Sequence, residues 1–192
     1  MKNISNLSNL SANEAKQILL LLLQKSHAHG QAAAHIYTGY SRGLFISSPE
    51  RQHLRGIAQN QQQHNQVLDV LLRQLHTRPS KLRDGVMGGL GSGLGLLCIF
   101  GAHRVPLYSA GWMAAKAVEI HLKTARYAWL ANHPEIVPEL LDLAEAAWDH
   151  ATHFKQKLPT PRQNLRVDFA RFCQDQHKQR IHSDLQRIKP TP

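Results

Sequence analysis

The chain has 192 residues, a length that suits one domain with a full hydrophobic core. Hydrophobic residues make up 42% of it, which excludes a disordered chain. The formal net charge is +10 at pH 7, so we expect an anionic partner. The chain has no zinc-finger spacing, RNA-binding motif or basic ribbon interleaved with aromatic residues, which favours a membrane surface over nucleic acid.

The cysteines and the apolar segments bear on the cell compartment. Cys98 and Cys173 form no disulfide framework, which fits a reducing compartment. The start of the chain lacks signal-peptide features, because polar residues precede the short apolar run 19–23 and no small-residue cleavage site follows. No apolar segment reaches the roughly 20 residues of a spanning helix. We therefore expect a peripheral protein on the cytoplasmic side of a membrane.

The first predicted helix opens with a capping box. Residues 1–10 are polar and predicted to be loose, and the sequence Ser11-Ala12-Asn13-Glu14 then starts the helix. It should end near residues 41–43. One face of it carries Leu20, Leu23, His27, Gly30, Ala34 and Tyr37.

The second predicted helix begins at Ser48-Pro49-Glu50 and runs to about residue 76. Its apolar face also carries Gln61 and His64, and a buried polar pair needs hydrogen-bond or metal partners. The other members of that face, at spacings of three and four, are Ile57, Leu68, Leu71 and Leu75.

A glycine-rich segment follows the chain break at Arg78-Pro79-Ser80. Residues 85–95 lack the Gly-Lys-Ser/Thr ending of a phosphate-binding loop, and no strand precedes them. We interpret the segment as a helix, ending near residue 101, whose small residues let another backbone or lipid approach closely.

The last predicted helices carry further candidate ligands. A fourth helix spans about 106–131 and a fifth about 134–157, and a basic amphipathic helix covers roughly 162–188. Glu119 lies on an apolar stripe of the fourth helix, and His150 and His153 continue a stripe of the fifth. Three helices thus aim ligands at a common core, as in helical metal proteins. The alternative is that these are hydrogen-bonded core residues.

Several short motifs follow one another, with few gaps, over roughly residues 20–170. They are His27-Ala28-His29-Gly30-Gln31-Ala32-Ala33 with Ile36-Tyr37-Thr38-Gly39, then Gln61-x-x-His64, Arg78-Pro79-Ser80-x-Leu82, Ala117-Val118-Glu119, Asp149-His150-Ala151-Thr152-His153 and Leu158-Pro159-Thr160-Pro161. In this order they resemble the demethoxyubiquinone hydroxylase family, the ferritin-like di-iron enzymes of ubiquinone biosynthesis. The resemblance implies an all-α, ferritin-like up-and-down bundle over 11–160, with an extra apolar Gly-rich helix. The basic helix and tail over 161–192 would follow the bundle.

The ligand set departs from that family. Its two irons are held by four Glu and two His, and the first, second and fourth Glu fall on Gly30, Gln61 and His150. The third falls on Glu119 or, one or two positions later, on Ile120 or His121, and the spacing to Leu130 and Pro134 favours Glu119. The family's residue type is kept by His64, Glu119 and His153.

We therefore expect one metal ion rather than two, because a single carboxylate balances the four positive charges of two ferrous ions poorly. Two His and one carboxylate, from His64, Glu119 and His153, suit mononuclear iron, and adding His150 also suits zinc. Gln61 and His27 are weaker candidates, His27 because it lies one turn from Gly30 and compensates in part. The alternative is a metal-free site in which the polar residues satisfy one another.

Three functions remain open. The resemblance implies an iron-dependent monooxygenase that hydroxylates a membrane polyprenyl quinol, with no catalytic acid or base beyond the metal ligands. The lost ligands suggest instead a non-catalytic bundle that binds quinone or lipid beside other ubiquinone-biosynthesis proteins. The basic C-terminal helix suggests a protein that binds anionic membrane surfaces.

Overall fold

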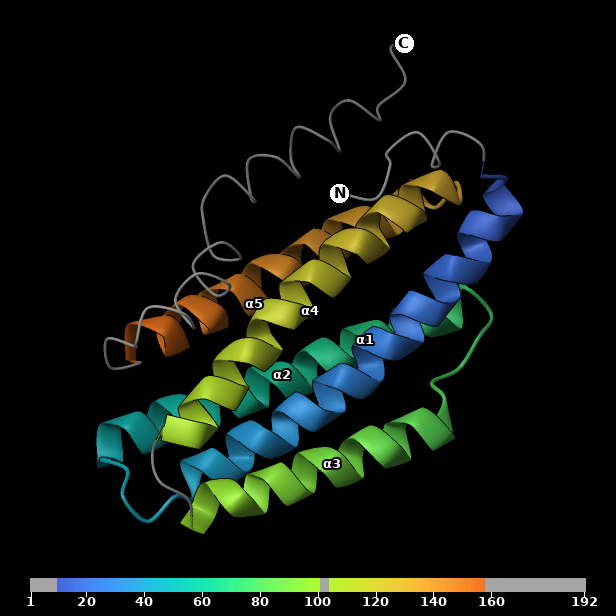
Figure 1. Cartoon of the computed structure of the whole chain (residues 1–192). Helices are drawn as coiled ribbons and strands as arrows, with labels where there is room; N and C mark the ends of the chain where they lie inside the picture. The colour runs from blue at the N-terminus through green and yellow to red at the C-terminus, as the bar shows by residue number, and fades with distance from the viewer. Residues whose placement is uncertain (1–9, 101–103, 158–192) are drawn as a thin grey trace.

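The computed structural model describes residues 10–100 and 104–157, and in these ranges every regular element is helical (Figure 1). The predicted all-α bundle is confirmed. The expected loose segment 1–10, apart from Leu10, and the expected basic helix after residue 161 lie outside the described residues. The elements are α1 (Ala12–Ser41), α2 (Ser48–Gln74), α3 (Lys81–Phe100), α4 (Arg104–Leu130), the short 3-10 turn η2 (Pro134–Ile136) and α5 (Val137–Lys157).

The helix ends follow from local chemistry. The side chain of Ser11 accepts a hydrogen bond from the Glu14 amide, and the Ser11 amide donates to the Glu14 carboxylate at 2.9 Å, so the predicted capping box opens α1. α2 begins with proline in its first turn, as expected. His76 and Asn132, just after α2 and α4, adopt φ values of 58° and 59°, the left-handed conformation that stops a helix.

α1 is the central helix of the bundle. It packs against α2, α3 and α4, while α5 packs mainly on α4. α3 therefore lies on one outer side of the molecule and α5 on the other (Figure 1). A ferritin-like four-helix arrangement would correspond to α1, α2, α4 and α5, with α3 added outside.

Glycines bring the backbones of α1 and α3 into contact. A Cβ at Gly91 of α3 would lie 2.6 Å from the Cα and carbonyl oxygen of Ala32 in α1. A Cβ at Gly39 of α1 would overlap the backbone of Gly95 in the same way. The glycine-rich segment thus forms a helix that another backbone approaches closely, as its sequence indicates.

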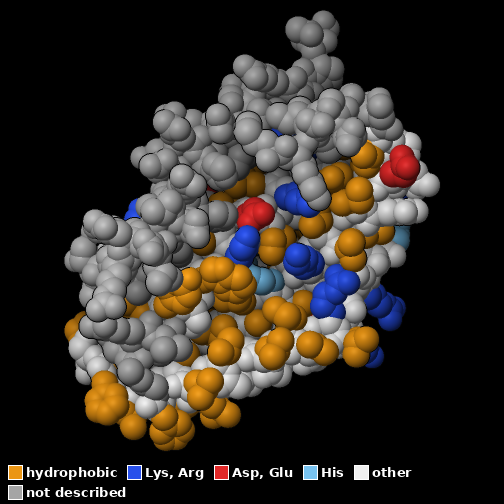
Figure 2. Space-filling view, in the orientation of Figure 1, with side chains coloured by type: hydrophobic (Ala, Val, Ile, Leu, Met, Phe, Trp, Pro, Cys, Tyr) orange, Lys and Arg blue, Asp and Glu red, His pale blue; other side chains and the backbone are white. Residues whose placement is uncertain are grey.

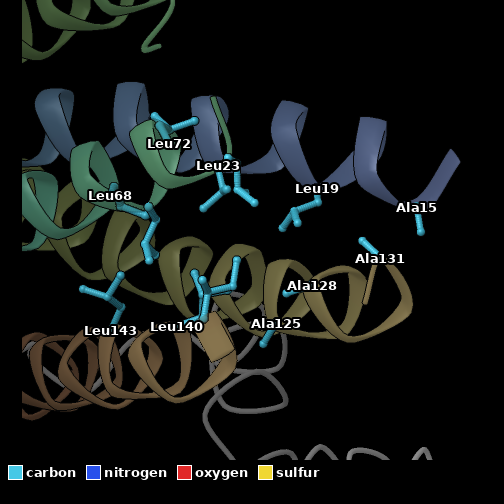
Figure 3. Packing of buried hydrophobic residues seen from close by; sticks show 13 residues of the cluster. Ala15, Leu19, Leu23, Leu68, Leu72, Ala125, Ala128, Ala131, Leu140 and Leu143 are labelled. Carbon is cyan, nitrogen blue, oxygen red and sulfur yellow. The ribbon is translucent and has the colours of Figure 1, made fainter. Parts of the chain in front are cut away.

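Two large apolar clusters, one toward each end, and a small one of Ala114, Ala115 and Ala151 fill the bundle. In the first, Figure 3 shows Leu19 and Leu23 of α1 pointing toward Ala128 of α4 and Leu140 of α5. The second cluster joins all five helices through residues that include Tyr37, Leu54, Cys98, Leu107 and Phe154. A layer of polar side chains lies between the two clusters along the helices.

The outer face of α3 is apolar and exposed. Its side chains recur at helical spacing, and the two ends of the row, Leu82 and Phe100, are 80% and 74% exposed. Figure 2 shows hydrophobic side chains along the edge of the molecule that α3 forms in Figure 1. Within the described ranges, no helix has the length and hydropathy needed to span a bilayer. The row consists of Leu82, Val86, Leu90, Leu94, Leu97 and Phe100, which we call the α3 face.

Candidate functional site

Four helices each contribute one imidazole to the polar layer in the middle of the bundle. These are His29 of α1, His64 of α2, His121 of α4 and His150 of α5. His121 is only 5% exposed, His29 and His150 are also buried, and His64 is half-buried. The ring centroids of His64 and His150 are 6.1 Å apart. We call these four residues the histidine layer.

A small cavity opens within this layer. Its lining includes three of the imidazoles, those of His29, His121 and His150, together with Gln61 and Gly30. The cavity measures about 10 Å³, which is room for about one water molecule. It therefore admits a water or a single ion, and it excludes an aromatic ring.

Burial keeps the imidazoles of the layer uncharged at neutral pH. Desolvation, with smaller contributions from His64 and His29, lowers the pKa of His121 to about 3. Desolvation first, and then Lys25 and Lys116, lowers the pKa of His29 to about 4. Desolvation and neighbouring histidines lower the pKa of His150 to about 4. Neutral imidazoles keep a free lone pair, which is the form that binds metals.

The space beside Gly30, where the resemblance would put the first glutamate, is already filled. A Cβ on Gly30 would overlap the amide oxygen of Asn65 and lie 2.9 Å from Nε2 of Gln61. Two amide side chains of α2 thus occupy the space that a carboxylate on α1 would need. Asn65 follows Gln61 by one helical turn and so shares its face, a spacing that could have identified it as a site residue but that our prediction left out.

Three buried polar atoms around the cavity have no hydrogen-bond partner among the described residues. They are Oγ of Ser26, Oδ1 of Asn65 and Nδ1 of His121. An unpaired buried polar atom is costly, so such atoms usually bind an ordered water or an ion. The adjacent cavity has room for one.

Glu119 does not face the core, contrary to our prediction. Its carboxylate is exposed and accepts a hydrogen bond from Nζ of Lys116 at 2.7 Å. The inward position on this part of α4 belongs to His121, the alternative that the motif spacing left open. Residues two positions apart, such as Glu119 and His121, point about 200° apart around a helix, so only one of them faces inward.

His153 and His27 also lie away from the cavity. Nε2 of His153 is 3.5 Å from Oε1 of Glu50, near the end of the bundle. The ring of His27 lies between the carboxylates of Asp84 and Asp69. The six predicted site residues thus separate: His64, His150 and Gln61 belong to the polar layer, whereas Glu119, His153 and His27 have other partners.

Comparison of the chain with family models, curated proteins and solved structures finds no match. The resemblance to the hydroxylase family therefore stays a prediction from the motifs.

The donor set does not fit a di-iron centre. No carboxylate lines the cavity, and Gly30 supplies no ligand atom. Among the side chains that the structure describes, no three His, Cys, Asp or Glu groups already surround one point as metal ligands do. One late first-row ion suits the neutral imidazoles chemically, but the rings would have to turn toward each other to hold it.

Proposed function

We propose that the protein is a peripheral membrane bundle that binds a polyprenyl quinol or lipid on α3, as an accessory protein without a di-iron centre. The observation that supports this proposal is the exposed α3 face. Leu90, for example, is 58% exposed, although water-exposed apolar surface costs roughly 25 cal/mol per Å². Large exposed apolar patches commonly mark interaction sites.

The charge near this face suits an anionic membrane. Arg78 and Lys81 are exposed where α3 begins, next to the apolar row. Each basic residue near an anionic surface contributes about 1 kcal/mol of attraction. Apolar side chains flanked by basic ones therefore favour a lipid surface over a neutral aqueous partner.

The histidine layer supports binding rather than turnover of the quinol. Its cavity of about 10 Å³ cannot admit a quinol ring, so the ring would stay outside the layer. The carboxylates that balance two irons in the resembled family are replaced by Gly30, Gln61 and His150. A ligand held on α3 would not reach a family-type centre in this bundle.

Liposome flotation tests this proposal. We expect the purified protein to float with vesicles of anionic lipid and polyprenyl quinone, and less with neutral vesicles. The double substitution Leu90→Glu and Leu94→Glu should abolish flotation, because it places charge in the apolar row. Val70→Glu is the matched control, since Val70 is 48% exposed on α2 and should float normally. Equal flotation of all variants, or none of the wild type, would refute the proposal.

A single-metal monooxygenase is the second candidate function. It is favoured by the neutral buried imidazoles and by Nδ1 of His121, which has no partner among the described residues. Mass spectrometry of protein without a histidine tag would measure the metal content, and oxidation of a demethoxyquinol with iron and reductant would measure activity. About one iron per chain, with activity lost in His121→Leu, would favour the enzyme over the accessory protein.

A further inference from the structure

A second polar cluster lies where α2 begins and α5 ends, outside the histidine layer. It contains Glu50 in the first turn of α2, His53 one turn later, and His153 and Lys157 in the last turns of α5. Figure 1 shows these two helix ends on the same side of the bundle. The backbones of α2 and α5 make few close contacts, and side chains connect the two helices here and at His64 and His150.

Two buried polar atoms with lone pairs lie close together in this cluster. Oε1 of Glu50 and Nε2 of His153 are 3.5 Å apart. Glu50 is only 8% exposed, and neither atom meets hydrogen-bond geometry with any described residue. A tetrahedral zinc ion with bonds of about 2.0–2.2 Å separates two ligand atoms by about 3.4 Å. The observed separation of 3.5 Å, that of an ion pair, is also close to one edge of a zinc coordination tetrahedron.

His53, on the same helix as Glu50, is the candidate third ligand, and its ring would have to turn to complete the group. The two residues are three positions apart, so they share a face of α2, the Glu-x-x-His spacing of metal sites in helical bundles. The ring of His53 lies 4.1 Å from that of His153, centroid to centroid. His53 is exposed, so its ring turns toward the shared point without repacking a core.

We propose that Glu50, His53 and His153 bind one zinc ion that joins α2 to α5. Two imidazoles and one carboxylate leave the fourth position of a tetrahedral zinc ion to water. Lys157 is the competing cation, because its ammonium group pairs with the second oxygen of Glu50. Its side chain is 44% exposed, so it withdraws into solvent when the metal binds.

Cobalt is the spectroscopic probe, because tetrahedral and octahedral Co²⁺ differ in visible absorption. The full chain, purified without a histidine tag, is titrated with Co²⁺, and Zn²⁺ is then added as a competitor. We expect one tetrahedral site that Zn²⁺ empties. His53→Ala and Glu50→Gln should each weaken it by at least about ten-fold, since even outer-shell partners of a metal ligand have effects of that size. His35→Gln, an exposed residue of α1 outside both clusters, is the control that keeps the spectrum.

Lys157→Gln separates the metal site from a simple ion pair. If the site binds zinc, removal of the competing cation strengthens binding, so the Zn²⁺ dissociation constant falls. If the cluster is only an ion pair, the variant loses stability and gains no affinity. A wild-type protein without a tetrahedral cobalt spectrum, or a spectrum unchanged in the exposed variant His53→Ala, would overturn the proposal.

Discussion

Nδ1 of His27, on α1, lies 3.0 Å from Oδ1 of Asp84, on α3. The other ring nitrogen, Nε2, is 3.5 Å from Oδ1 of Asp69, on α2. One buried imidazole therefore connects three helices. This contact anchors the N-terminal half of α3, whereas the glycine contacts hold its C-terminal half.

Asp84→Asn should loosen the contact between α1 and α3. A hydrogen bond to a charged group contributes about 1.5–3 kcal/mol, so we expect the free energy of unfolding to fall by about that much. Urea denaturation measures it. The comparison is Glu119→Gln, which removes an exposed ion pair with Lys116 and should cost less than about 1 kcal/mol. Equal losses in the two variants would contradict a special role for His27.

Two glycines of α3 should respond oppositely to the same substitution. Gly91→Ala should destabilise the protein by about 1–3 kcal/mol, because its Cβ would strike the backbone of Ala32. Gly89→Ala meets nothing within 4 Å and should stabilise the protein by about 0.5–1 kcal/mol through helix propensity. Thermal unfolding distinguishes them. Stabilisation by both substitutions would mean that α3 does not pack closely on α1.

Gly30→Glu should not recreate a family-type metal centre. Its side chain would displace Asn65 and overpack the layer, a change that costs about 1–3 kcal/mol. Gly56→Glu, at a position with open space around it, should lower the free energy of unfolding far less. Unfolding free energies and metal content of the two variants test this. Two irons bound by Gly30→Glu would show that the layer can open for a carboxylate.

Acid should unfold the protein through the histidine layer. The folded-state pKa values of His29, His121 and His150, about 3 to 4, lie below the ordinary value of 6.5. The unfolded chain therefore binds more protons than the folded chain once the pH falls below about 6.5. Stability should be full above that pH and should fall progressively toward pH 4.

Denaturation curves at pH 7 and pH 5 measure this effect. His121→Leu should shrink the difference between the two pH values, because it removes the most strongly shifted imidazole. A shift of one unit corresponds to about 1.4 kcal/mol. The exposed variant His35→Gln should keep the wild-type difference. A pH dependence that is the same in His121→Leu and wild type would argue against the layer as its source.

The sequence predicts the helices well because caps, proline and glycine act locally. Ser11, Pro49 and Pro79 each mark a helix boundary within a few residues of its observed place. The apolar spacing around Gln61 likewise identifies the face of α2 that turns inward. Both kinds of signal need only neighbouring residues.

The site was harder to predict because it depends on contacts between distant segments. An error of two residues in the register of α4 exchanged buried His121 for exposed Glu119. Glu50 has the sequence pattern of an ordinary helix start, and only its position beside α5 gives it a partner in His153. No local sequence pattern predicts that the side chain of Asn65 fills the space beside Gly30.

The central position of α1 has a consequence for the order of folding. α1 with α2, and α4 with α5, are contacts between helices close in sequence, and such local pairs form quickly. The contact of α1 with α4 joins these two halves across a long loop of chain, so its closure comes late. During synthesis the inward side chains of α1, among them Leu19, Ile36 and Tyr37, emerge from the ribosome well before α4 is made. The apolar face of α1 is therefore exposed to water during this interval. A chaperone would protect the nascent chain from aggregation most at this stage.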